Sequence, residues 1–443
     1  MDTPICDFVR RYAQSNTLRL HMPGHKGNAF LGVEHLDITE ICGADSLYEA
    51  EGIIAQSEDN ASSLFGCRTF YSTEGSSQCI RAMLYLALLQ AKQQGRPPLI
   101  AAARNVHKTF LSAVALLDLD VMWLYPENEE SYLSSTISPE KLNALLQSAE
   151  QKPVAVYLTS PDYLGNIAPI REIAAVCHRH GVLLLVDNAH GAYLRFLEES
   201  LHPMDLGADL CCASAHKTLP VLTGGAYLHI SSGEISKQAK NALALFGSTS
   251  PSYLILQSLD LANAYLEGYQ HMLCSFLPEL DQLKHDLSDQ GFQLVGSEPM
   301  KITIAAKSYG CTGNELAQYL REQGIECEFS DPDYLVVMLT PEITEADLQR
   351  LKTALLSIPK CPPILQRPPQ PRMGKKRLSV RQAMLSPGEM VSVSESEGRI
   401  LAAASVGCPP AVPILVCGEE IDRDAVDCFR YYGVESVTVV SRK

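Results

Sequence analysis

The residues most able to carry out chemistry are an aspartate and a lysine thirty positions apart. Asp187 directly follows the apolar run 183–186, and Lys217 lies between two further apolar runs, 209–213 and 225–230. Short all-apolar runs bounded by turn residues are typical of strands buried on both faces. Both side chains are therefore expected near the ends of such strands, where open α/β sheets bind their ligands.

These two residue types suit one kind of organic cofactor. A lysine can hold a carbonyl cofactor as a Schiff base, and an aspartate facing a pyridine nitrogen keeps that nitrogen protonated, so that the ring accepts electrons from a carbanion. The pair therefore predicts a site for pyridoxal 5'-phosphate (PLP). Taken alone, an aspartate at a strand end is more often a turn residue or a helix cap.

A candidate phosphate seat precedes this pair in the sequence. Gly75, Ser76 and Ser77 follow the strand-like run 69–72 and open a long stretch with apolar residues at helical spacing. Backbone N–H groups at a helix N-terminus, together with hydroxyl groups, bind phosphate well. Serine is equally a common N-cap in helices that bind no ligand, so this signal is weak by itself.

An imidazole follows the next predicted strand. His107 comes after the apolar run 99–103, at the same kind of strand end, and could stack on a planar ligand. As an isolated residue it is also compatible with a purely structural role. Strand and helix patterns alternate at least four times before Asp187, which favours a doubly wound, mainly parallel sheet. His107, Ser76 and Lys217 would then meet at one edge of it.

The pattern changes after residue 230 and indicates further domains. The amphipathic stretch 254–273 could link two of them, and a strand–helix–strand–strand–helix unit is expected from 301–306, 314–323, 325–329, 334–339 and 344–356. A proline-rich segment then predicts an extended linker. The expected divisions are an N-terminal arm 1–50, an α/β large domain 51–275, a small α+β domain 276–358, a linker 359–372 and a C-terminal α+β domain 373–443.

Composition excludes several classes of partner. The 443 residues carry a formal net charge of −15 and no lysine- or arginine-rich stripe, which argues against nucleic acid and anionic membrane surfaces. No run approaches the ~20 apolar residues of a membrane span, and the first residues lack an apolar signal-peptide core. The 14 cysteines are scattered without zinc-binding spacing. A cytoplasmic protein without a metal centre is expected.

Several motifs resemble one known family. They are HMPGHKG (21–27), GADSLYEAEGIIAQSE (43–58), ARNVHKT (103–109), TSPDYLGNIAPI (159–170), VDNAHGA (186–192), SAHKTLPVLTGGAYLH (214–229) and STSPSYLILQSLD (248–260). In this order they resemble the bacterial ornithine/lysine/arginine decarboxylases of PLP fold type I, the aminotransferase-like fold. Residues 396–410 and 413–421 resemble that family's C-terminal domain. The resemblance is to the short forms, which lack an N-terminal receiver-like domain.

The resemblance implies roles for individual residues. Lys217 would bind PLP, Asp187 would face the pyridine nitrogen, His107 would stack on the ring, and Ala189 would lie beneath it. Lys217 or His216 would return a proton to the substrate Cα. Among the three His-Lys dipeptides, only the one at 216–217 follows the aspartate strand and precedes a Gly-Gly turn. The residues expected around the phosphate are Gly75, Ser76, Ser77, Ser214 and His216.

The implied activity is decarboxylation of lysine, arginine or ornithine by a homodimer or higher oligomer with shared sites. Residues 248–252 and the loop at Gly24 would reach across the interface. Five positions depart from the family pattern, namely Glu74, Asp162, Asn188 and the pair 411–412. These departures leave two alternatives open. One is another fold type I enzyme, such as an aminotransferase or lyase, and the other is a catalytically silent PLP-binding regulator.

Overall fold

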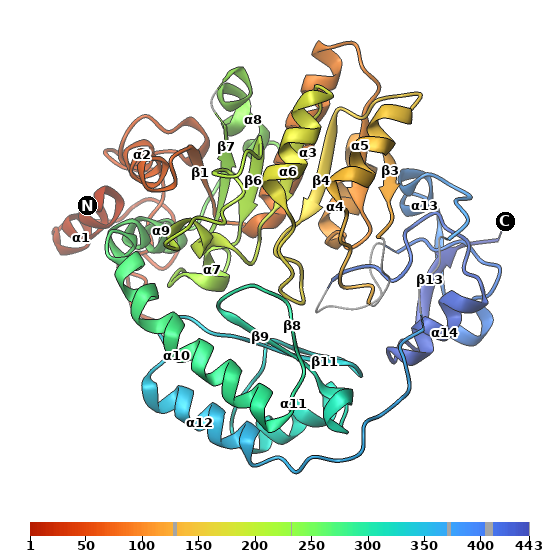
Figure 1. Cartoon of the computed structure of the whole chain (residues 1–443). Coiled ribbons are helices and arrows are strands. Elements are labelled where there is room, and N and C mark those ends of the chain that lie inside the picture. Colours follow the sequence, from red (N-terminus) through yellow and green to blue (C-terminus); the bar gives the residue numbers. More distant parts are fainter. Residues whose placement is uncertain (127–130, 232, 370–373, 404–410, 443) are drawn as a thin grey trace. The chain divides into compact units, whose positions relative to one another are not determined.

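The computed structural model describes residues 1–126, 131–231, 233–369, 374–403 and 411–442 (Figure 1). These residues divide into two compact units, each made of two pieces of chain. The first unit consists of Met1–Gly95 and Leu183–Cys274, and the second consists of Arg96–Val182 and Ser275–Lys443. The chain therefore leaves the first unit after residue 95 and returns to it 88 positions later.

A seven-stranded, mainly parallel sheet has the strand order β1-β7-β6-β5-β4-β2-β3. Its strands are β1 (Arg68–Ser72), β2 (Leu99–Ala103), β3 (Asp120–Leu124), β4 (Ala155–Thr159), β5 (Leu183–Asp187), β6 (Leu210–Ala213) and β7 (Ala226–Ile230). Only β7 runs antiparallel to its neighbours, pairing Ala213 with Tyr227 and Ser72 with Ala226. The predicted fold class is confirmed, and the runs 69–72, 99–103, 183–186, 209–213 and 225–230 locate five of these strands to within one residue.

The first unit places helices around its part of this sheet. They are α1 (Pro4–Gln14), α2 (Ile53–Phe65), α3 (Gly75–Gln93), the one-turn α7 (Ala215–Thr218), α8 (Ala239–Ala244) and α9 (Tyr253–Leu266). All five residues of β7 and all four of β6 are buried, which fits their apolar sequences, with His229 of β7 as the polar exception. Because β1, β6 and β5 share one direction, their carboxyl ends lie at one edge of the sheet.

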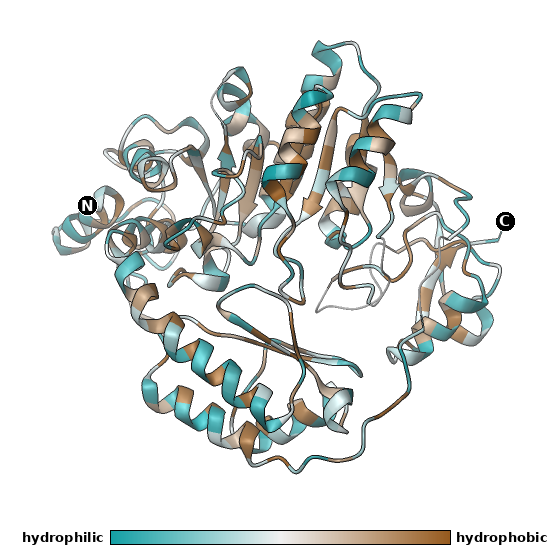
Figure 2. Ribbon diagram, in the orientation of Figure 1, coloured by the Kyte–Doolittle hydropathy of each residue, from teal (hydrophilic) through white to brown (hydrophobic). Residues whose placement is uncertain are grey.

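The helices that follow the strands of the second unit are α4 (Lys108–Leu117), α5 (Pro139–Ser148) and α6 (Ile170–Arg179). Local sequence explains where they begin. Ser138 caps α5 by accepting a hydrogen bond from the Lys141 amide at 3.2 Å, and Pro139 occupies the first helical position. Figure 2 shows brown, apolar strands between helices whose outer faces are teal.

The long helix α10 (Tyr269–Gln290) leads into a four-stranded antiparallel sheet of order β10-β11-β9-β8. Its elements are β8 (Leu294–Val295), β9 (Lys301–Ala305), α11 (Gly313–Glu322), β10 (Phe329–Ser330), β11 (Tyr334–Met338) and α12 (Glu345–Leu356). The amphipathic stretch 254–273 contains most of α9 and the start of α10. One prediction was wrong here. The expected strand 325–329 is reduced to β10.

The C-terminal part contains α13 (Val380–Met384), β12 (Gly388–Ser392), α14 (Arg423–Tyr431) and β13 (Ser436–Val440). Strands β12 and β13 pair antiparallel and pack with α14 around Phe429 and Val439, both fully buried. Positions 370–372 of the expected linker and 404–410 of the motif 396–410 lie outside the described residues. The divisions expected for the five domains remain predictions.

A buried acidic cluster connects this C-terminal part with the small sheet inside the second unit. Asp333 accepts hydrogen bonds from Tyr431, at 2.6 Å, and forms an ion pair with Lys307 at 2.8 Å. Its neighbour Asp331 is 6 % exposed and accepts the amides of Asp333 and Tyr334, both at 2.7 Å. Burial raises the pKa of Asp331 to about 7.

This raised pKa predicts a pH-dependent stability. In the unfolded chain Asp331 ionises near 3.8, whereas the folded protein keeps its proton up to about pH 7. The stabilising contribution of this proton is full below pH 3.8 and is lost as the pH rises to 7, a loss of at most about 4 kcal/mol. Asp331→Asn should flatten this part of the curve in urea unfolding at several pH values. The exposed control Asp289→Asn should leave the native pH dependence, and identical curves for both variants would contradict the assignment.

Candidate active site

Lys217 lies on α7, the single helical turn that follows β6. Its Nζ is 3.0 Å from Nε2 of His190, a residue that is only 5 % exposed. The sequence predicted a polar loop here, but the Leu219 amide donates to the Ala215 carbonyl at 2.9 Å and closes a helical turn. The turn holds the lysine half-buried beside the imidazole. A short-range contact with a ring nitrogen is one way to position an amine for proton transfer.

Asp187 is the last residue of β5 and is 2 % exposed. Its Oδ1 accepts a hydrogen bond from the Ala189 amide at 3.2 Å and another from Sγ of Cys212 at 3.5 Å. Parallel pairing places Asp187 directly opposite Cys212 on β6. The carboxylate is thus held by its own strand end and by the strand that leads to Lys217.

The predicted phosphate seat and the lysine segment meet through two hydroxyl groups. Ser214, at the end of β6, donates from Oγ to Oγ of Ser76 at 2.8 Å, and Ser76 lies in the first turn of α3. Ser77 follows it in the same turn. On the other side of Ser214, Nδ1 of His216 lies 2.9 Å from the Gly225 carbonyl, so its ring is directed at the Gly-Gly turn.

A glycine fixes the start of α3 on this edge. Gly75 has a φ of +72° and donates its amide to the Gly224 carbonyl at 2.7 Å. Gly224 itself has a φ of +102°, and a Cβ there would lie 2.9 Å from the Thr73 carbonyl oxygen. Such a conformation is readily available only to glycine, and the contact would push the two segments apart.

Gly224→Ala is therefore expected to weaken PLP binding at least about tenfold, because a displacement of the Ser76 and Ser77 turn forfeits about 1.4 kcal/mol or more of phosphate binding. Equilibrium titration of cofactor-free protein with PLP measures the effect. Gly233→Ala serves as the control, since a Cβ at that exposed positive-φ glycine meets nothing within 4 Å. Equal PLP affinity in the two variants would contradict the role given to Gly224.

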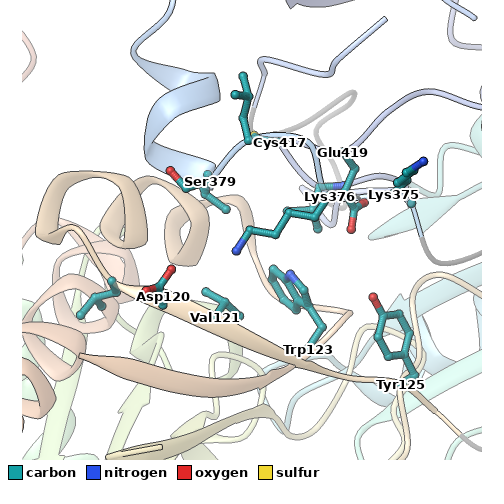
Figure 3. A pocket seen from close by; sticks show the side chains of 14 residues that line it. Asp120, Val121, Trp123, Tyr125, Lys375, Lys376, Ser379, Cys417 and Glu419 are labelled. Atoms are coloured by element: carbon teal, nitrogen blue, oxygen red, sulfur yellow. Dashed lines mark hydrogen bonds between the residues drawn. The ribbon is translucent and has the colours of Figure 1, made fainter. Parts of the chain in front are cut away.

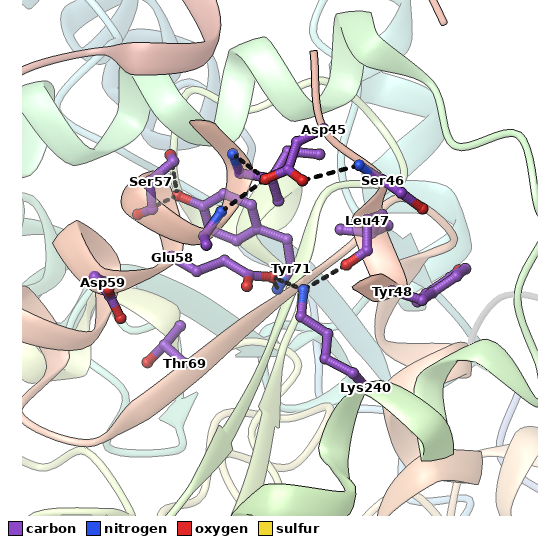
Figure 4. A network of polar contacts seen from close by, with 12 residues as sticks. Asp45, Ser46, Leu47, Tyr48, Ser57, Glu58, Asp59, Thr69, Tyr71 and Lys240 are labelled. Carbon is purple, nitrogen blue, oxygen red and sulfur yellow. Dashed lines mark hydrogen bonds and ion pairs between the residues drawn. The ribbon is translucent and has the colours of Figure 1, made fainter. Parts of the chain in front are cut away.

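A buried polar network stands behind this seat in the first unit (Figure 4). Asp45 accepts the amides of Gly52 at 2.8 Å and Ile54 at 3.0 Å and so caps α2. Glu58, on α2, accepts the Tyr71 amide at 2.9 Å and pairs with Lys240 at 2.6 Å. Burial raises the pKa of Glu58. The motif 43–58 thus fixes the end of β1 immediately before the seat.

Gln78, on α3, connects the seat to this network. Its Oε1 accepts from Ser72 Oγ at 2.6 Å, and its Nε2 donates to the Tyr48 hydroxyl at 2.7 Å and to the Leu243 carbonyl at 2.9 Å. Glu74, the departure next to the seat, has its carboxylate engaged by the Ser248 amide. Its negative charge is therefore used to hold the segment 248–252.

Two further departures have local structural roles. Asn188 is fully buried and donates from Nδ2 to the Gly191 carbonyl at 3.0 Å. Ala411, where the family pattern has glycine, adopts a φ of +60°, a left-handed conformation that favours glycine. Its carbonyl accepts the Lys108 amide at 2.8 Å. The backbone geometry explains the family's glycine, and alanine is among the smaller side chains that can replace it.

The remaining predicted residue, His107, belongs to the second unit. It is the N-cap of α4, where Nδ1 accepts the Thr109 amide at 3.2 Å and lies 2.9 Å from Thr109 Oγ1. This bond fixes the ring orientation. Its stacking on a cofactor stays a prediction, as do the individual roles expected for Asp187, Lys217 and the phosphate ligands.

Two acidic side chains, Asp162 and Glu419, have partners within the second unit. Asp162 is 3 % exposed and accepts the Asn166 amide and Nδ2, both at 2.9 Å, and burial raises its pKa. Glu419 is held by both guanidinium nitrogens of Arg104, at 2.9 and 3.1 Å. The first carboxylate stabilises its loop, and the second forms a buried ion pair.

His190 is the site residue that the sequence reasoning missed. It lies inside the motif 186–192, three residues after Asp187. The signal was present in the sequence, because a histidine so close to a strand end joins the same edge as the aspartate. Its contact with Lys217 Nζ depends on the path of the chain between them.

Comparison with known proteins assigns the family. The model of the Orn/Lys/Arg decarboxylase major domain matches residues 3–275, and the model of that family's C-terminal domain matches residues 364–437. The chain belongs to the Orn/Lys/Arg decarboxylase family. Membership confirms the resemblance seen in the sequence and makes the protein an amino-acid decarboxylase.

Individual relatives agree with this assignment. The arginine decarboxylase of Bacillus subtilis is 30% identical over 96% of this chain and 92% of its own length, and that of Halalkalibacterium halodurans is 30% identical over 95% and 91%. The fold is shared with the lysine decarboxylase LdcF of Francisella novicida, at a TM-score of 0.81 and 17% identity, over 99% of this chain and 81% of that one. Among the described residues, no helix combines the length and apolar character needed to cross a membrane.

Proposed function

We propose that this Orn/Lys/Arg decarboxylase uses PLP to remove the α-carboxylate of a basic amino acid, with arginine as the first candidate substrate. The observation that carries the proposal is the group of Asp187, His190, Ser76, Ser214 and Lys217 at one edge of the first unit. The choice of arginine rests on two relatives, the arginine decarboxylases of Bacillus subtilis and Halalkalibacterium halodurans, which this chain matches over nearly its full length.

The side chains present fit PLP. An amine beside an imidazole, a buried carboxylate on a neighbouring strand end and two hydroxyls 2.8 Å apart at a helix start match an aldehyde, a pyridine nitrogen and a phosphate. When bound, PLP supplies the electron sink that a departing carboxylate requires. One solved structure that contains PLP shares the fold with this chain, at a TM-score of 0.53 and 15% identity.

Each of these residues would then have a separate role in the reaction. Asp187 would hold a proton on the pyridine nitrogen, and Ser76, Ser77 and Ser214 would orient the phosphate. Lys217 would bind the cofactor and, once released by the substrate amine, would return a proton to Cα. His190 would position Lys217 through the 3.0 Å contact of Nε2 with Nζ. His216 is the second candidate proton donor.

A substrate screen tests this proposal. Purified protein loaded with PLP is incubated with arginine, lysine or ornithine, and both CO2 and the amine product are quantified. Release of CO2 with stoichiometric agmatine is the expected result. Cadaverine or putrescine as the main product would move the assignment to lysine or ornithine. A 2-oxo acid without CO2 would indicate an aminotransferase, and PLP binding without turnover of any of the three would indicate the silent regulator.

We infer in addition that the enzyme is a cytoplasmic homodimer or a multiple of it. Every cysteine in the described part of the chain is free. The N-terminal segment exposes large apolar side chains, Leu20 and Phe30 at 81% and Leu31 at 88%, which is unusual for a surface that faces only water. Light scattering during size exclusion should give twice the 48.5 kDa chain mass or more. A fully active monomer would contradict shared sites.

A further inference from the structure

A separate cavity of about 320 Å³ lies within the second unit (Figure 3). Val121, Trp123 and Tyr125 form one wall, and Lys375, Lys376 and Ser379 come from the C-terminal part of the chain. This volume is within the range of pockets that hold small organic ligands. None of the residues expected to bind PLP lines it.

The aromatic wall follows from the alternation of β3. Positions 121, 123 and 125 are two apart, so their side chains lie on the same face. Strand β3 ends the order of its sheet, next to β2 on one side only. Trp123 is held by Arg104, whose guanidinium lies 5.1 Å from the ring centroid, and by the edge contact with Phe110 at 6.1 Å. The indole is therefore a fixed surface against which a flat group can pack.

The electrostatics of the cavity favour an anion. Glu419 also lines it, but its charge is matched by the bidentate contact with Arg104. Lys375 and Lys376 are exposed, and among the described residues neither ammonium has an ion-pair partner. Asp120 is the opposing charge, since it lines the same cavity and has no ion-pair partner in the described residues. The lining thus carries two ammonium groups and one unpaired carboxylate, and Figure 3 shows the Lys376 side chain extended toward Val121 and Trp123, whereas Lys375 points away from them.

We propose that this cavity binds a small anion that carries a flat aromatic ring, with the ring against Trp123 and Val121 and the anionic group at Lys376. Both components are needed. Exposed ammonium groups alone bind anions weakly in water, and an aromatic wall alone does not select a charge. Burying a ring of this size against an indole and a valine supplies the additional affinity.

Phenyl phosphate is the probe, and the protein reports its own occupancy. Trp123 is the only tryptophan in the sequence, so fluorescence excited at its absorption edge comes from one wall of the cavity. Titration of the PLP-loaded protein should give a saturable change in Trp123 emission, with the visible PLP absorbance unchanged. Inorganic phosphate and benzyl alcohol, each supplying one half of the probe, should bind at least about tenfold more weakly.

Three variants locate the site. The double variant Lys375→Gln/Lys376→Gln should weaken phenyl phosphate at least about tenfold, and Asp120→Asn should strengthen it about twofold or more, because one removes attraction and the other repulsion. Lys152→Gln, at an exposed lysine away from the cavity, should have no effect. All four side chains lie at the surface, so folding is not at risk.

Several outcomes would overturn the proposal. One is the absence of a saturable Trp123 signal, and a second is equal affinity for phenyl phosphate and inorganic phosphate. A third is unchanged affinity in the double lysine variant. Since the signal requires neither turnover nor a particular substrate, these results are independent of the decarboxylation assay. If the protein decarboxylates arginine but does not bind phenyl phosphate, only the proposal for this cavity is wrong, and the proposed function stands.

Discussion

Lys217→Ala is expected to lower the rate of CO2 release by at least about 10⁴-fold, because the variant loses both covalent binding of the cofactor and a group that transfers protons. The visible absorbance band of the lysine-bound cofactor should disappear as well. Borohydride reduction of the native protein, followed by mass spectrometry, should find the cofactor mass on the peptide that contains Lys217.

The other two His-Lys dipeptides supply matched variants. Lys26→Ala and Lys108→Ala should retain the visible band, and Lys237→Ala, at a surface ion pair with Glu234, should behave as the native protein. Labelling of Lys26 or Lys108 by borohydride, with full turnover retained in Lys217→Ala, would show that the wrong lysine had been assigned. This result would also remove the role proposed for His190, which is to position Lys217.

Asp187→Asn should leave cofactor binding nearly intact but reduce kcat on the order of 10²- to 10³-fold. The amide keeps the size of the carboxylate and can still accept the Ala189 amide, so the strand end should hold its shape. It lacks the negative charge that keeps the pyridine nitrogen protonated. The kinetic loss should therefore fall on kcat more than on KM.

Asp209→Asn is the matched control for this experiment. Asp209 accepts the Leu184 amide at 2.7 Å, at the opposite end of β5, so it tests the effect of an Asp-to-Asn change on the same pair of strands. A kcat for Asp187→Asn within about threefold of the native value would exclude the proposed pairing with the ring. Equal losses in both variants would indicate a structural effect.

Much of the fold could be predicted from local patterns because buried strands are short, apolar and bounded by turn residues. Strands 183–186 and 209–213 were found in this way. The direction of a strand could not be predicted in this way. The apolar pattern of β7 resembles that of β6, although β7 runs antiparallel to β6. Strand β8, with two residues, is too short to show any period.

The sequence predicted which residue types of the site lie at strand ends. It did not predict which of these side chains contact one another. Ser76 and Ser214 were each assigned to the phosphate, but their 2.8 Å hydrogen bond joins positions 138 apart and depends on strand order. The Glu74 carboxylate accepts the Ser248 amide, a partner 174 positions away that no local pattern indicates. Pairings across long separations are not encoded in local periodicity.

The division of the first unit into two pieces of chain affects how it can be made. The Cys6 amide donates to Asp260, 254 positions away, and Glu58 pairs with Lys240, 182 positions away. At about 5–20 residues per second, a ribosome needs roughly 10–40 s to add the second member of the Glu58 pair after the first. Throughout that interval Glu58 lacks the lysine that neutralises its buried charge. Chaperone binding to nascent chains should thus end only after residue 274 has emerged.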